Sequence, residues 1–232
     1  MPVVPTARRR RDQPPRRPTA PDLPAELPPA PGALGNGADW VCLQADAGLR
    51  IPERLYDVSL TECVLSEAGL GGRRISGFQA RDVVFERCDL AGTVFTGSCR
   101  MTRVSFRGCR MTGVVLAGAE LTDVLIEDGT ATMASLLGTE ATSLWVTGTP
   151  LREADLSEAV LRNVALLDCD LAGVELRGAR IRGVCLHGSR LAELRSAATL
   201  SGAGVRLDEA QLLELGLALV ADLKVHVTDR PG

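Results

Sequence analysis

A period of five residues runs through most of this chain and constrains its fold more than any other feature. One position of each five-residue block is apolar in 27 successive blocks, from Leu60 to Leu191, with one extra residue near Ser98 that shifts the phase. A helix repeats every 3.6 residues and a flat strand every 2, so neither element produces this pattern. We therefore expect a coil that turns a corner every five residues.

A second position, two residues before each apolar centre, is also restricted. It holds a small or apolar residue in most blocks, such as Cys88, Ala119 or Val124. Both positions should point inward, because the remaining three hold mainly Arg, Glu, Asp, Thr, Ser and Gly. Aromatic residues make up only 3% of the chain, which predicts a narrow interior. Many blocks end in Gly, which suits a turn at every corner.

Several blocks carry a more specific pattern. Residues 88–92 read Cys-Asp-Leu-Ala-Gly and residues 154–158 read Ala-Asp-Leu-Ser-Glu, which resembles the Ala-(Asp/Asn)-Leu-x-x signature of pentapeptide-repeat proteins. The resemblance covers residues 60–193, and the Arg-, Ala- and Gly-rich vocabulary is similar to that of actinobacterial members. It implies an all-β fold, a right-handed quadrilateral β-helix in which four blocks form one coil and residues twenty apart stack. Nearly seven coils at a spacing of about 4.8 Å give a rod roughly 33 Å long.

The segments outside the repeat differ in composition. Residues 1–39 hold ten of the thirteen prolines together with a run of four arginines, and predict a disordered Pro/Arg-rich tail. This tail is either a solvated extension or a tether for nucleic acid or another anionic surface. Residues 40–59 are expected to form an N-terminal cap, and residues 194–232 a C-terminal cap with an α-helix over about 208–223.

The predicted C-terminal helix carries more apolar surface than a single contact with the rod requires. It is either a plug for the open end or, as the resemblance to family members with a dimerising helix implies, the contact of a homodimer. The apolar side chains concerned are Leu212, Leu213, Leu215, Leu217, Leu219, Val220 and Leu223.

Residue types that could support catalysis or bind a metal lack the necessary spacing. There is no Cys-x₂-Cys pair, and His187 and His226 have no recognisable acid, nucleophile or metal partner in the sequence. A glycine loop of the phosphate-binding type is also missing. We therefore expect no catalytic residue, no metal and no cofactor. Five cysteines instead fill the small inward position: Cys63, Cys88, Cys99, Cys109 and Cys169. The other two, Cys42 and Cys185, are expected to be more exposed.

The charges on the outward positions are mixed in sign. Three arginines stand twenty residues before three acids, which predicts the cross-coil pairs Arg100–Glu120, Arg103–Asp123 and Arg107–Glu127. The best acidic patch, which arginines interrupt, consists of Asp155, Glu158, Asp168, Asp170 and Glu175.

The stretch from Gly129 to Pro150 departs from the repeat, and we expect irregular or bulged coils there. Beside it Trp145 occupies an outward position. This tryptophan is either an anchor for a protein partner or folded over a gap in the coil.

These features predict a non-enzymatic interaction or scaffold module with an unidentified protein partner. An alternative, which the family resemblance implies, is a DNA mimic that binds and protects DNA gyrase, a type II topoisomerase; it predicts a long negative face. A third hypothesis is salt-dependent binding of nucleic acid through the arginine-rich tail. The sequence has neither a membrane-spanning apolar run nor a secretory leader, so we expect a cytoplasmic protein without a membrane partner.

Overall fold

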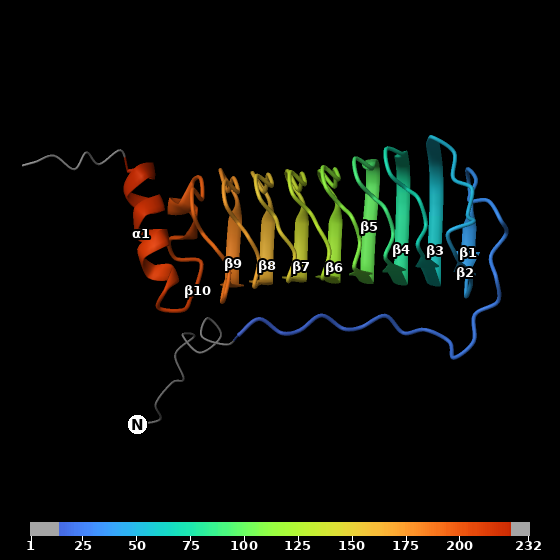
Figure 1. Cartoon of the computed structure of the whole chain (residues 1–232), viewed down its shortest axis with the longest axis horizontal. Helices are drawn as coiled ribbons and strands as arrows, with labels where there is room; N and C mark the ends of the chain where they lie inside the picture. Colours follow the sequence, from blue (N-terminus) through green and yellow to red (C-terminus); the bar gives the residue numbers. More distant parts are fainter. Residues whose placement is uncertain (1–13, 224–232) are drawn as a thin grey trace, which may run out of the picture.

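The computed structural model describes residues 14–223 as a rod of parallel strands with a helix at one end (Figure 1). The strands pair in sequence order, except that β1 and β2 both pair with β3. A short 3-10 helix, η2 (Ala197–Leu200), and the helix α1 (Gln211–Asp222) close the C-terminal end. The strands are β1 (Asp39–Val41), β2 (Gln44–Ala45), β3 (Arg54–Ser66), β4 (Arg74–Glu86), β5 (Val94–Arg107), β6 (Glu120–Glu127), β7 (Glu140–Thr147), β8 (Val160–Leu167), β9 (Arg180–Cys185) and β10 (Val205–Arg206).

The strands are stacked in a twenty-residue register. Leu121 lies opposite Ala141, and Ala141 lies opposite Leu161 in the next strand. Between β4 and β5 the offset rises from twenty at Ser76–Thr96 to twenty-one at Phe78–Cys99, where the extra residue is absorbed. The all-β solenoid with a C-terminal helical cap, predicted from the five-residue period, is confirmed.

The core is one continuous column of side chains along the rod. Both restricted positions of the repeat supply it, so that small residues such as Ala119 and Cys63 alternate with larger ones such as Leu121. The rings of Phe85 and Phe106 stack in adjacent coils with centroids 4.9 Å apart and planes within 7° of parallel. Burial of this apolar surface, at roughly 25 cal/mol per Å², is the main stabilising contribution.

One edge of the rod carries a row of polar residues in left-handed backbone conformation, which we call the corner column. Their φ angles lie between +52° and +57°, and each sits at the corner of its coil. Asn and Asp adopt this conformation more readily than most residues, and the corner directs their side chains outward. The corner column consists of Glu62, Asp82, Arg103, Asp123, Ser143 and Asn163.

The prediction of bulged coils between residues 129 and 150 is wrong. The twenty-residue register continues without a shift from β6 through β7 to β8. The buried threonines at the inward position are compatible with a regular coil because their hydroxyls are satisfied. Thr139 donates to the Leu116 carbonyl at 2.8 Å, and Thr149 donates to the Thr147 carbonyl at 3.0 Å.

The structure also differs from the disordered tail predicted over residues 1–39. Residues 1–13, with the run of four arginines, lie outside the described residues, but residues 14–38 follow the rod from its C-terminal part to its N-terminal end (Figure 1). Around Pro28 the chain joins the first coil, since the Gln44 N–H donates to the Pro28 carbonyl and the Ala30 N–H to the Gln44 carbonyl. We call residues 14–27, which lie alongside the rod, the arm.

The helix α1 closes the rod through side chains that bond to backbone groups of the last coil. Gln211, 4% exposed, donates from its amide to the carbonyls of Leu186 and Ser189. The Asp222 carboxylate accepts from the N–H groups of Ser196 and Ala198 at 3.2 and 2.9 Å. In earlier coils the backbone N–H groups at equivalent positions donate to carbonyls of the following coil, as the Leu176 N–H does to Arg195. The last coil has no following coil, and the side chains of α1 take over this role.

Candidate interaction surfaces

The outer face of α1 is the largest exposed apolar feature of the described chain. The structure divides the seven predicted apolar residues of this helix. Leu215 and Leu219 pack against the core, whereas the other five are exposed and form what we call the helix face. Their exposed fractions are 61% for Leu212, 73% for Leu213, 64% for Leu217, 37% for Val220 and 67% for Leu223.

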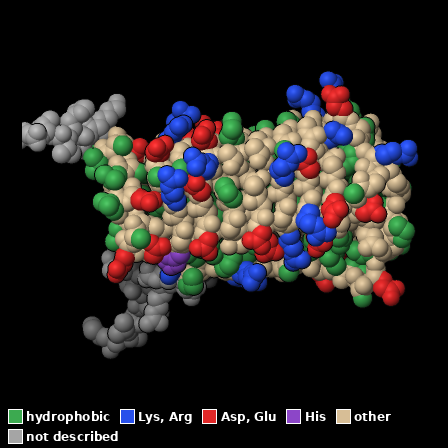
Figure 2. Space-filling model, viewed as in Figure 1, with side chains coloured by type: hydrophobic (Ala, Val, Ile, Leu, Met, Phe, Trp, Pro, Cys, Tyr) green, Lys and Arg blue, Asp and Glu red, His purple; other side chains and the backbone are tan. Residues whose placement is uncertain are grey.

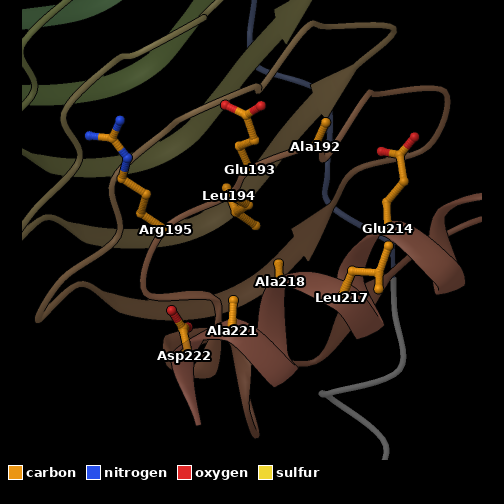
Figure 3. A pocket seen from close by; sticks show the side chains of 9 residues that line it. All are labelled: Ala192, Glu193, Leu194, Arg195, Glu214, Leu217, Ala218, Ala221 and Asp222. Atoms are coloured by element: carbon orange, nitrogen blue, oxygen red, sulfur yellow. The ribbon is translucent and has the colours of Figure 1, made fainter. Parts of the chain in front are cut away.

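An open hollow of about 490 Å³ adjoins the helix face, between α1 and the last coil (Figure 3). From α1 it is lined by Leu217, Ala218 and Ala221, with the carboxylates of Glu214 and Asp222 beside them. The opposite wall is formed by residues 192–195. An apolar floor with a charged rim is typical of a site for an apolar side chain of a protein partner.

A second surface follows the corner column and is covered by the arm. Asn163 holds Arg16 on both sides, because its Oδ1 accepts from the Arg16 N–H at 2.6 Å and its Nδ2 donates to the Arg16 carbonyl at 3.0 Å. The Thr19 N–H donates to Asp123 Oδ1 at 3.1 Å. The Asp22 N–H donates to Asp82 Oδ1 at 3.0 Å.

Trp145 lies beneath the arm. The guanidinium carbon of Arg17 is 6.0 Å from the centre of its ring, at the outer limit of a cation–π contact. The indole Nε1 is buried and has no hydrogen-bond partner among the described residues. The ring stands in regular register between Leu125 and Ala165, so it covers no gap in the coil. This chain's own arm occupies the face on which the sequence predicts a partner anchor.

Sequence reasoning missed the residues that hold the arm. Asp82, Asp123 and Asn163 looked like ordinary outward positions of the repeat. A signal was present in the tail, where Pro15, Pro18, Pro21 and Pro24 recur every three residues. This is the period of a polyproline II helix.

The predicted ion pairs are confirmed at two of three places. Arg100 pairs with Glu120 at 2.8 Å and Arg107 with Glu127 at 2.9 Å. The pair Arg103–Asp123 is wrong. Arg103 turns to the preceding coil and donates two hydrogen bonds of 2.5 Å to Asp82, while Asp123 accepts from the arm instead.

The hydrogen bonds from Arg103 and the arm favour the ionised form of Asp82. Burial opposes the charged carboxylate, but the hydrogen bonds from the Arg103 guanidinium and the Asp22 N–H outweigh burial and lower the pKa of Asp82. The same hydrogen bond raises the pKa of Arg103. Both side chains therefore stay charged, and Asp82 remains an acceptor for the arm.

The residues of the predicted acidic patch are divided among several rows of the rod. Asp155 and Glu175 are partners in adjacent coils, but Asp170 belongs to another row, where it pairs with Arg152 and Arg190 at 3.4 Å each. Asp168 and Glu158 lie at exposed corners with positive φ. On the face seen in Figure 2, basic and acidic side chains alternate along the rod. The five acids do not form one continuous acidic face.

The cysteines behave as core residues. All five at the small inward position are buried, as predicted, and burial raises the pKa of Cys99 to about 12 and that of Cys169 to about 11. Cys185 is also buried, contrary to expectation, whereas Cys42 is half-buried and donates to Glu62 at 3.1 Å. Among residues 14–223, no three His, Cys, Asp or Glu side chains gather as metal ligands. No helix in this range is long and apolar enough to cross a membrane.

Comparison with known proteins supports the repeat. The sequence matches the pentapeptide repeats family in eight copies, over residues 99–124 and 151–191. No curated protein matches the chain significantly.

Two solved structures are similar to this chain at low sequence identity. A trypsin-treated form of QnrB1, a plasmid-mediated fluoroquinolone resistance protein, is 19% identical, with 82% of this chain and 100% of that one covered and a TM-score of 0.38. HetL, a pentapeptide repeat protein involved in heterocyst differentiation regulation in the cyanobacterium Nostoc, is 16% identical over 66% of this chain and 72% of its own, with a TM-score of 0.26. The five-residue period and the family match agree: the chain contains pentapeptide repeats.

Proposed function

We propose that this protein is a non-enzymatic interaction module that associates with a second copy of itself through the helix face. The observation that supports the proposal is the exposure of Leu213 and Leu217, at 73% and 64%, beside the hollow. Fully burying one leucine contributes about 1.5–3 kcal/mol, so a contact that covers this face has a strong driving force. A two-fold contact also presents the hollow of each copy to the helix of the other.

Light scattering on the full chain after size exclusion tests this proposal. We expect a dimer for the wild type and a monomer for the double variant L213E/L217E, with thermal unfolding of the rod unchanged. The matched control is Met133→Glu, because Met133 is 60% exposed on the rod, away from α1. A wild type that stays monomeric at about 100 μM, well above a micromolar dissociation constant, overturns the homodimer.

The gyrase-binding alternative receives less support from the charges. A mimic of duplex DNA requires a long acidic face, whereas Arg100, Arg107 and Arg110 each pair with an acid of a neighbouring coil. Inhibition of gyrase supercoiling by the full chain, with and without a fluoroquinolone, decides between the two functions. Protection at micromolar protein would establish the mimic, and its absence would leave the interaction module.

A further inference from the structure

The arm and the corner column have matching repeats. The three backbone donors of the arm, at Arg16, Thr19 and Asp22, are three residues apart, and each directly follows a proline. Three residues of a polyproline II helix advance about 9.3 Å. The acceptors Asn163, Asp123 and Asp82 are two coils apart from one to the next, which at about 4.8 Å per coil is about 9.6 Å.

The burial of the arm agrees with this geometry. Pro15 is buried and Pro18 and Pro21 are half-buried, whereas Arg16 and Thr19 are exposed. A helix with three residues per turn presents every third residue to the same side. The prolines therefore lie against the rod, and the N–H group that follows each of them reaches the acceptor.

The two corner residues between these acceptors, Arg103 and Ser143, form hydrogen bonds with other residues of the corner column. Arg103 has no acceptor atom in its side chain and is bound to Asp82. The Ser143 hydroxyl accepts from Asn163 Nδ2 at 2.7 Å. From Asp82 to Asn163, only every second coil presents a side chain that accepts a hydrogen bond from the arm. This spacing of about 9.6 Å suits a ligand whose N–H groups recur every three residues.

We propose that the corner column, together with Trp145, is a binding site for an extended proline-rich segment of a partner protein, and that residues 15–24 are its built-in ligand. The segment carries a proline at every third position, a residue with a free N–H after each proline, and an arginine that lies over Trp145 as Arg17 does. Because the arm is tethered, a partner competes with an effective concentration on the order of millimolar. This site is separate from the helix face.

The binding of the arm to the corner column can be weakened by substitutions in the arm alone, which leave the site unchanged. In the full-length variant R16P/T19P, two donors are lost while proline retains the polyproline II conformation. The matched control is A20P/A25P, since the N–H groups of Ala20 and Ala25 make no hydrogen bond with any residue that the structure describes. The probe is a fluorescent synthetic peptide with the sequence of residues 14–25, and its binding is measured by fluorescence anisotropy.

We expect the peptide to bind R16P/T19P about tenfold more tightly than it binds the wild type or A20P/A25P, since two competing hydrogen bonds are removed. A peptide with proline in place of Thr19 should bind R16P/T19P about fivefold more weakly than the unchanged peptide. Adding D123G to R16P/T19P removes an acceptor at a position where glycine accepts the positive φ, and should weaken binding by a similar factor.

Three results would overturn the proposal. The first is no peptide binding to R16P/T19P up to about 1 mM, the effective concentration of the arm. The second is equal binding with and without Asp123→Gly, which indicates non-specific attraction. The third is a change in oligomeric state of R16P/T19P relative to A20P/A25P, which assigns the arm to the rod of a second copy. L213E/L217E tests the helix face independently, so either surface can fail alone.

Discussion

The carboxylate of Glu214 in α1 accepts a hydrogen bond of 2.5 Å from the backbone N–H of Leu191 in the last coil. One coil earlier, the equivalent N–H of Leu171 donates to the carbonyl of Arg190. The helix thus supplies by side chain what a further coil supplies by backbone. The open end of a stack of strands invites pairing with other chains. Here α1 both covers this end and forms hydrogen bonds with its backbone groups.

Glu214→Ala should destabilise this end of the rod. It leaves the Leu191 N–H without its acceptor, which costs about 1–3 kcal/mol. We expect faster amide hydrogen exchange at Leu191 and a lower free energy of unfolding in urea. E214Q keeps an acceptor oxygen and should lose less, and E209A, which removes an exposed side chain, should change neither quantity. Equal effects of E214A and E209A would contradict this role.

Phe106→Ala should cost about 3–5 kcal/mol, because it removes a buried ring that stacks on Phe85 and leaves a cavity in a narrow core. Urea denaturation followed by circular dichroism measures the loss. Tyr56→Ala serves as the comparison, since Tyr56 is 48% exposed and such a change is usually within about 0.5 kcal/mol. Similar losses for both variants would show that the Phe85–Phe106 pair contributes little.

Asp82 should make the stability of the protein depend on pH in the acidic range. Its pKa is lower in the folded state than in the unfolded chain, where it is about 3.9. Its contribution is therefore fully present above about pH 4 and is lost as the pH falls through the folded pKa. We expect the wild type to be more stable than D82N at pH 7, with the difference in melting temperature shrinking below about pH 4. A difference that stays constant with pH would refute the assignment.

Glu62→Gln should accelerate the alkylation of Cys42. The hydrogen bond to Glu62 is the main cause that raises the pKa of Cys42, and partial burial adds to it. Since the thiolate is the reactive form, removal of the carboxylate lowers the pKa and raises the rate with iodoacetamide at pH 8. Mass spectrometry of the alkylated peptides measures it, with the buried Cys99 and Cys169 unreactive in both proteins. An unchanged rate at Cys42 would exclude control by Glu62.

Much of the rod could be predicted from the sequence because a repeat encodes its own register. The five-residue period predicts which side chains point inward, and a coil of twenty residues then decides which residues stack. The pairs Arg100–Glu120 and Arg107–Glu127, the extra residue near Ser98 and the buried Cys99 all follow from counting along the chain.

The tertiary structure decided what counting could not. Arg103 lies within twenty-one residues of both Asp82 and Asp123 along the chain, and only the folded side chains decide that it bonds to Asp82. The contact of the arm with Asp123 joins residues 104 apart in sequence and lies outside any local pattern. The outward direction of Leu213 and Leu217 depends on how α1 lies on the last coil. The arm's period of three was visible in its prolines, but its docking required two unrelated spacings, about 9.3 Å and 9.6 Å, to coincide in space.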